Sequence, residues 1–114
     1  MKIVFSSKGN DWNAQLDQHF GRAKGFVLLD EESQEMTWHD NQQNVMASQG
    51  AGIQAAQNVA QLGAELVITG HTGPKAFNTL KKAQIRIMLA PKDITLEQTY
   101  EMYRAGKLEE QTQE

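Results

Sequence analysis

The glycine-rich stretch GHTGPK at residues 70–75 holds residue types that could bind an anion. It directly follows the apolar run ELVIT and contains two glycines, a histidine, a proline and a lysine. Glycine lets a backbone approach a ligand closely, and the N–H groups at the start of a helix attract negative charge. The same residues also suit an ordinary turn, in which Thr72 caps a helix that begins at Pro74. Because capping alone accounts for these residue types, both interpretations stay open.

Two further stretches could lie beside this turn. The sequence SSKGN at 6–10 follows a predicted strand, and SQGAG at 48–52 precedes a predicted helix. Ligands in open α/β sheets bind at the carboxyl ends of parallel strands, so we expect all three stretches at one sheet edge. Lys8 and Lys75 would add positive charge there. The pattern is neither a Walker loop nor a GxGxxG fingerprint, which leaves the kind of anion undefined.

Two of the three histidines are candidates for ligand contacts. His19 lies in the polar segment DQHFGRAKG beside a glycine and the cation Arg22, and His71 lies in the glycine-rich turn. His39 belongs to an alternating strand pattern and is expected to face solvent. A lone loop histidine is more often a surface residue than a ligand, and sequence spacing does not show whether His19 and His71 converge. Met46 is a further soft donor, which we expect to pack under its loop.

The composition excludes several classes of active site. The chain of 114 residues has no cysteine, so disulfides, thiolate metal sites and thiol nucleophiles are absent. Neither GxSxG nor HExxH occurs, and the strand KIVFSS carries no carboxylate for a two-metal nuclease. A non-enzymatic protein is therefore predicted, and a hydrolase without a recognisable motif is left as the minority alternative.

The charge balance argues against nucleic acid and membrane partners. Eleven basic and 14 acidic residues give a formal charge of −3, which creates no field to gather nucleic acid or anionic lipid. No run approaches 18 apolar residues, and the N-terminus lacks the pattern of a signal peptide. We therefore expect a cytoplasmic protein.

Hydrophobic periodicity predicts a single α/β domain over residues 1–108 with a frayed acidic tail at 109–114. Short apolar or alternating runs predict five strands, of which the second and third form a hairpin: 2–6, 26–30, 35–40, 65–69 and 84–89. A hairpin followed by two crossover units gives a mixed sheet in which the first strand is central.

Local signals place three helices between and after these strands. An apolar stripe begins at Ala51 and ends before Gly63, and Pro74 can start the second helix. Thr95 and Gln98 could form a capping box at the start of the last helix, which Gly106 would stop. The segment 41–50 shows no periodicity and is predicted to be a loop.

Several segments together resemble the dinitrogenase iron–molybdenum cofactor-binding family. The resemblance covers nearly all of the chain and rests on the order and spacing of four pieces: KIVFSSKG, HFGRAKGFVLLD at 19–30, QGAGIQAAQNVAQLGAELVITGHTGPKAFNTLKKAQIRI at 49–87, and TLEQTYEMYRAGKL. It implies a ribonuclease H-like three-layer fold with a mixed five-stranded sheet of order 3-2-1-4-5 and an antiparallel strand 2.

The resemblance also implies a function related to nitrogen fixation. Members of this family bind an iron–molybdenum or related iron–sulfur cluster, or its precursor, and pass it between cofactor assembly proteins. A similar role here implies a non-catalytic carrier that holds the cluster non-covalently, with His19 and His71 as metal ligands and Arg22 and Lys75 offsetting negative charge. The binding residues so implied are His19, Arg22, Gly50, Gly52, Gly70, His71, Thr72, Gly73 and Lys75. Such a carrier would be a monomer or weak dimer.

Two alternatives use the same sequence features differently. The glycine loops could serve a regulatory module that binds a small anion or a nucleotide. The hairpin edge with an exposed Trp38 could instead belong to a protein-interaction domain without a small ligand.

Overall fold

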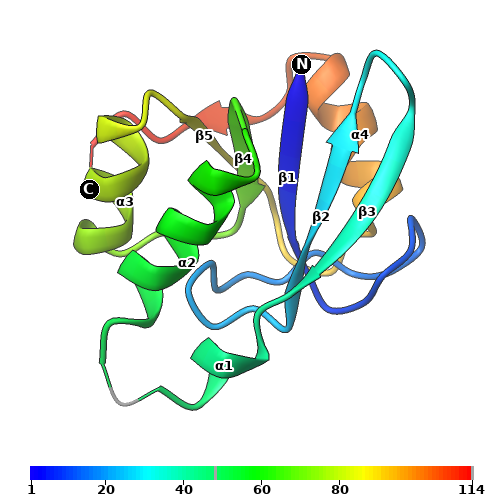
Figure 1. Cartoon of the computed structure of the whole chain (residues 1–114). Coiled ribbons are helices and arrows are strands. Elements are labelled where there is room, and N and C mark those ends of the chain that lie inside the picture. Colours follow the sequence, from blue (N-terminus) through cyan, green and yellow to red (C-terminus); the bar gives the residue numbers. More distant parts are fainter. Residues whose placement is uncertain (48, 114) are drawn as a thin grey trace.

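A computed structural model describes residues 1–47 and 49–113, and the described residues form one six-stranded sheet flanked by helices (Figure 1). The strands are β1 Lys2–Ser7, β2 Gly25–Asp30, β3 Glu35–Asp40, β4 Leu66–Thr69, β5 Arg86–Leu89 and β6 Glu109–Glu110. The helices are α1 Gln42–Val45, α2 Ala51–Gln61, α3 Pro74–Lys82 and α4 Leu96–Arg104.

The sheet is mixed and has the order β3-β2-β1-β4-β5-β6. Strand β1 is central, antiparallel to β2 and parallel to β4, which in turn pairs in parallel with β5. The hairpin of β2 and β3 completes one side of the sheet. These pairings confirm the predicted order of the first five strands and the antiparallel second strand; the ribonuclease H-like assignment stays a prediction.

Strand β6 corrects the prediction of five strands and a frayed tail. It pairs with β5 in antiparallel fashion, with Glu110 opposite Met88. Leu108, just before it, is buried against the α4 side of the sheet. A salt bridge of 2.8 Å joins Arg86 Nη2 to Glu110 Oε1. The tail was mispredicted because an acidic and polar segment without an apolar residue carries no strand pattern of its own.

The helices cover both faces of the sheet, as Figure 1 shows with α2 and α3 in front and α4 behind. Along β1, Val4 points into the core beneath α2 and α3, whereas Ile3 and Phe5 point into the core on the α4 side. This alternation follows from the two-residue period of a strand. The central strand β1 is therefore buried on both faces, so its buried side chains are not available to a ligand.

Caps fix where the longer helices begin. Pro74 occupies the first turn of α3, and Thr95 and Gln98 form the predicted capping box of α4. Gly63 and Gly106 follow α2 and α4 with φ of 83° and 72°, the left-handed conformation expected after a helix end.

The segment 41–50, predicted as a loop, contains the short helix α1. Two buried asparagines, the N-cap residue Asn41 and Asn44 within the helix, explain the difference, because hydrogen bonds rather than apolar contacts hold this element in place. Asn41 Nδ2 donates to the carbonyl oxygens of Gly21 and Ala23, and Asn44 Nδ2 donates to Asn41 Oδ1. No hydrophobic periodicity signals such an element.

Trp38 was predicted to be exposed, and this prediction is wrong. Its ring is half-buried, packs against the apolar cluster on the α4 side of the sheet, and lies directly over Gly25. His39, on the opposite face of β3, is also partly buried, and its Nε2 lies 2.8 Å from Thr37 Oγ1. Within the described ranges, no helix is both long and apolar enough to cross a membrane.

Candidate functional site

A cavity of about 430 Å³ opens where the loop before β2 meets the first turns of α2 and α3. We name it the α2–α3 cavity. Seven predicted site residues line it: His19, Arg22, Gly50, Gly52, His71, Gly73 and Lys75. Its other lining residues are mostly apolar and were not among the predicted binding residues: Phe20, Gly21, Ala51, Ile53, Pro74 and Ala76.

Backbone pairing brings the two candidate histidines together. His19 and His71 form an isolated parallel bridge, and the Phe20 N–H donates to the His71 carbonyl oxygen at 3.3 Å. Asp17 Oδ1 accepts from the His19 N–H at 3.0 Å and shapes the turn in front of this bridge. Both imidazole side chains are exposed. The structure therefore places two imidazoles, far apart in the sequence, at the wall of one cavity.

The starts of α2 and α3 both face this cavity without a side-chain cap. Their N-cap residues, Gly50 and Gly73, offer no side-chain oxygen, and neither helix has an acidic residue in its first turn. Helix α4 differs, because Thr95 caps it and Glu97 lies in its first turn. The first amide N–H groups of a helix lack intrahelical acceptors and carry partial positive charge. Two such ends at one cavity favour an anionic ligand.

Close backbone contacts hold these helix ends against each other. A Cβ on Gly52 would lie 3.2 Å from the Cβ of Ala76, so α2 and α3 touch near their first turns. A Cβ on Gly21 would lie 2.9 Å from Gly52 Cα, which leaves no room for a larger residue in the loop. In the sequence, the glycine of HFGR, Gly21, is the signal for this contact. A glycine is needed there because the packing leaves no room for a side chain.

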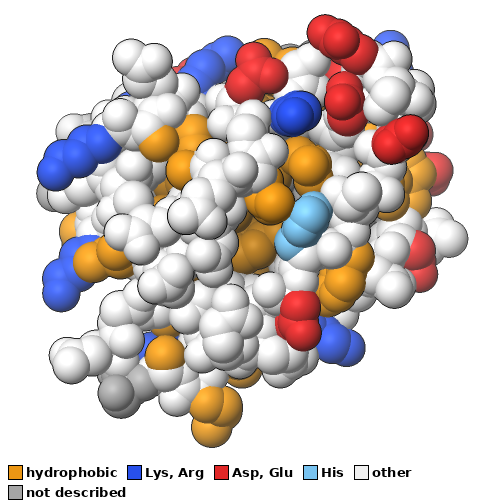
Figure 2. Space-filling view, in the orientation of Figure 1, with side chains coloured by type: hydrophobic (Ala, Val, Ile, Leu, Met, Phe, Trp, Pro, Cys, Tyr) orange, Lys and Arg blue, Asp and Glu red, His pale blue; other side chains and the backbone are white. Residues whose placement is uncertain are grey.

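The charged residues of the α2–α3 cavity are cations. Arg22 and Lys75 line it, and no aspartate or glutamate does so among the residues that the structure describes. Helix α3 carries two more lysines, Lys81 and Lys82, in its last turn. In Figure 2, several basic side chains lie on the α3 side, at the left, and most acidic ones gather toward the tip of the β2–β3 hairpin, although each sign also occurs elsewhere on this face.

Arg22 also anchors the segment that leads into α2. Its Nη1 donates to three carbonyl oxygens around the end of α1, those of Asn44 at 3.4 Å, Val45 at 3.1 Å and Ala47 at 2.7 Å. A guanidinium has donors on its other nitrogens as well. Arg22 can therefore hold this segment and still present positive charge to a ligand.

Two predicted site residues do not line the cavity. Thr72 is buried, and its hydroxyl donates at 2.7 Å to Oε1 of Gln111, a residue that does not line the cavity either. Gly70 lies against Gln18, whose Cα would be 2.7 Å from a Cβ at this position. Both residues hold the turn in place rather than line the cavity.

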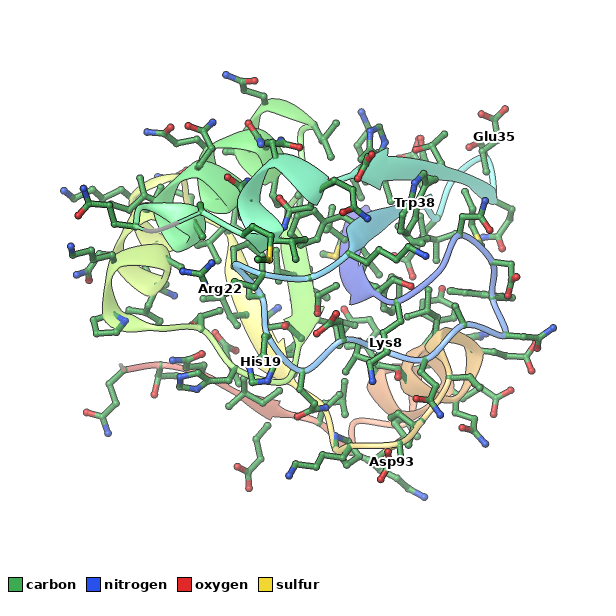
Figure 3. All side chains as sticks on the ribbon, turned by 90° about the horizontal axis from the view of Figure 1, so that it is seen from below. Lys8, His19, Arg22, Glu35, Trp38 and Asp93 are labelled. Carbon is green, nitrogen blue, oxygen red and sulfur yellow. The ribbon has the colours of Figure 1, made fainter. Side chains whose placement is uncertain are left out.

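A second cavity, of about 430 Å³, lies on the other side of the histidines. It shares His19 and His71 with the first, and its charged residues have both signs: Lys8, Asp17, Lys92 and Asp93. Figure 3, seen from below, shows Arg22, His19 and Lys8 along this edge of the molecule, with Asp93 farther out. Lys8, expected beside the glycine-rich turn, lines this second cavity together with His71 of that turn, and it does not line the α2–α3 cavity.

A family model described as dinitrogenase iron–molybdenum cofactor matches residues 1–106. The chain belongs to this dinitrogenase cofactor family. The match includes every residue of the α2–α3 cavity and ends before β6.

Two solved structures similar to this dinitrogenase cofactor family member agree with its fold, and one curated protein is similar in sequence. The apo form of the orange protein from Desulfovibrio gigas is 33% identical, with a TM-score of 0.93 over 98% of this chain and 93% of that one. A Thermotoga protein, TM1290, provisionally named NifB and placed in the DUF35 family, is 27% identical, with a TM-score of 0.84 over 96% and 91% of the two chains. The uncharacterised protein MJ0580 of Methanocaldococcus jannaschii is 27% identical over 99 residues, 85% of this chain and 83% of its own.

The donor set of this family member limits how a metal centre could be held. Residues 1–47 and 49–113 contain no group of three or more histidine, cysteine, aspartate or glutamate side chains that could hold a metal ion. Iron–sulfur clusters are usually bound by cysteine thiolates, which this chain lacks. His19 and His71 can supply two imidazoles at most. A cluster bound here would need sulfides of its own to complete the coordination of its metal atoms, and contacts of the protein with its negative charge to hold it in place.

Proposed function

We propose that this protein is a non-catalytic carrier that binds a compact anionic metal–sulfur cluster, an iron–molybdenum cofactor or a related precursor, in the α2–α3 cavity. The observation that carries the proposal is the pair of glycine-capped helix starts that face one cavity together with Arg22 and Lys75. Membership of the dinitrogenase cofactor family supports this cargo over other anions.

Each part of the cavity wall has a chemical task in this proposal. First-turn amides of α2 and α3 donate hydrogen bonds to the sulfides of the cargo, and the two cations offset its charge. His19 or His71 supplies an imidazole nitrogen to a metal atom that has an open position. Phe20, Ile53 and Ala76 form an apolar wall that excludes water and strengthens these electrostatic contacts.

The absence of cysteine favours reversible binding. A cluster held by several thiolates leaves its protein slowly, whereas amide, imidazole and ion contacts can be exchanged for those of a second protein. The proposed partners are therefore cofactor assembly proteins that deliver and accept the cluster, and the proposed location is the cytoplasm, where such assembly takes place.

Anaerobic titration of the ligand-free protein with isolated iron–molybdenum cofactor tests the proposal. After gel filtration, metal analysis should find iron and molybdenum in the protein peak of the wild type. A His19→Ala/His71→Ala variant should retain much less metal with an unchanged melting temperature, because both side chains are exposed.

His39→Ala is the matched control, because this histidine lies on β3 outside both cavities and should bind as the wild type does. A wild-type protein that elutes without metal would show that the carrier proposal is wrong. Equal retention by the double variant would show that neither imidazole is needed as a metal ligand.

A regulatory module for a small anion or nucleotide is the second candidate. The lack of a grouped metal-binding set in the described part of the chain favours it, because helix starts and cations alone are sufficient for phosphate. NMR titration with inorganic phosphate and with a nucleoside triphosphate would test it. Shifts of the Gly52 and Lys75 amides at micromolar ligand, without cofactor binding, would support this second candidate.

A further inference from the structure

The C-terminal strand β6 leads directly into a buried glutamine behind the proposed binding site. Gln111 follows β6 and lies beyond the 106 residues that the family model matches. Its backbone N–H donates to the Ile87 carbonyl oxygen at 2.8 Å, which fixes this residue to the sheet. The residue is only 8% exposed, which is uncommon for a glutamine. A buried amide of this kind needs hydrogen-bond partners.

The partner of this glutamine is Thr72, in the middle of the turn that carries His71. Thr72 Oγ1 donates to Gln111 Oε1 at 2.7 Å, and both side chains are buried. Gln111 Nε2 points to the Thr72 carbonyl oxygen at 3.5 Å, a longer contact, and to the Gln113 carbonyl oxygen at 3.4 Å. The glutamine side chain therefore contacts Thr72 on both its hydroxyl and its backbone.

Thr72 separates the two functional parts of the turn. It stands between His71, which lines both cavities, and Gly73, the N-cap of α3. The His71 carbonyl oxygen also accepts a hydrogen bond from the Phe20 N–H. The position of the turn is therefore coupled to the loop that carries His19. Fixing Thr72 thus fixes the backbone that carries His71, and with it the backbone of His19 and the start of α3.

We propose that Gln111 is a positioning residue, which holds the His71 turn in the geometry that binds the cargo. The inference rests on the proposed function for its effect on binding, and its effect on the turn can be measured without any ligand. Gln111 itself does not line the α2–α3 cavity. It acts through the Thr72 hydroxyl, so variants of either residue should have the same consequence.

The test compares two disruptive variants with two matched controls. Thr72→Val keeps the shape of the side chain but removes the hydroxyl, and Gln111→Ala removes its acceptor. Thr72→Ser retains the hydroxyl and should rescue the effect of Thr72→Val. Gln113→Ala changes an exposed glutamine of the same segment and leaves intact the backbone carbonyl that Gln111 contacts.

The first readout uses the ligand-free protein. NMR spectra should show shifted ring signals of His71 and His19, and faster hydrogen exchange of the Thr72 and Gly73 amides, in Thr72→Val and Gln111→Ala only. The Thr72→Val/Gln111→Ala double variant should resemble the single variants, because both remove the same hydrogen bond, from Thr72 Oγ1 to Gln111 Oε1. Unchanged turn signals in both single variants would overturn the inference, whatever the cofactor titration shows.

The second readout is the affinity for isolated iron–molybdenum cofactor under anaerobic conditions. Loss of the buried hydrogen bond should weaken binding about tenfold in the two disruptive variants and leave both controls like the wild type. A loosened turn with wild-type affinity would overturn the positioning role. If the wild type binds no cofactor, the carrier proposal fails, while the ligand-free spectra still decide whether Gln111 orients the turn.

Discussion

The glycines of the candidate site have different physical tasks, although they look alike in the sequence. Gly52 allows contact between helices, and Gly70 makes room for the backbone of Gln18. Gly73 has a φ of −73°, and a Cβ there would meet no atom within 4 Å. Neither packing nor backbone conformation requires a glycine at this last position. What a side chain at Gly73 would change is the chemistry of the cavity, because it would reach the start of α3.

Substitution of Gly73 by aspartate should separate stability from anion binding. The new carboxylate can cap α3 and interact with the helix dipole, so the free energy of unfolding should rise by about 0.5 kcal/mol. The same carboxylate places negative charge beside Arg22 and Lys75, so binding of an anionic cluster or of phosphate should be largely lost. Denaturant unfolding and ligand titration measure the two effects.

Gly73→Asn is the neutral counterpart of this change. It can cap the helix through its side-chain oxygen but adds no charge, so it should bind the anion better than Gly73→Asp does. Equal binding by the two variants would mean that negative charge is tolerated at the start of α3, in conflict with the proposed anion site.

At the scale of elements, local signals were predictable and tertiary ones were not. The starts of α3 and α4 were predicted because Pro74 and the pair Thr95 and Gln98 act within one turn of helix. Helix α1 and strand β6 were missed because contacts with distant residues hold them. Arg22 binds the carbonyl groups at the end of α1, and Arg86 binds Glu110 of β6. No pattern within either short segment reports such a partner.

The pairing of β6 with β5 should weaken in acid. The hydrogen bond from Arg86 and, less, its charge lower the pKa of Glu110 below the ordinary value. A carboxyl whose folded-state pKa is lowered stabilises the fold above its unfolded pKa and loses that contribution as the pH falls through the folded value. The effect is therefore fully present at neutral pH. NMR shifts of the Gln111 amide, followed from about pH 7 to about pH 3, should show β6 loosening only at the acidic end.

Glu110→Gln serves as the control for this titration. Its amide does not ionise in this range, so the acid-dependent shift of Gln111 should disappear. The same acid transition in this variant would assign the effect to another group and remove the role of the Arg86–Glu110 pair.

For the whole molecule, sequence patterns predicted the order of the sheet, whereas only the family resemblance predicted that His19 and His71 share a pocket. Alternating and continuous apolar runs, together with crossover rules, were enough to place β1 at the centre. The contact of His19 with His71 depends on a loop path that no periodicity describes. Thr72 shows the same limit of sequence-based prediction, because a threonine suits a ligand contact as well as it suits the buried hydrogen bond to Gln111.

The two cores lie on opposite faces of one sheet, so they should unfold together. Leu80 of α3 is fully buried in the core beneath α2 and α3, whereas Trp12 and Trp38 pack against the core on the α4 side. Leu80→Ala should lower the free energy of unfolding by about 2–5 kcal/mol through lost burial and a remaining cavity. Strands β1 and β4 contribute side chains to both cores, which couples the two faces.

Denaturant unfolding of Leu80→Ala, followed by tryptophan fluorescence and by far-ultraviolet circular dichroism, measures this coupling. Both midpoints should move by the same amount, because a two-state domain gives one transition for every probe. Lys81→Ala, an exposed position on the same helix, should leave both midpoints unchanged. If the circular dichroism transition moved while the fluorescence transition stayed in place, the α4 side would be a separate folding unit. Disturbance of α3 and of the cavity at its first turn would then not reach the hairpin side of the sheet.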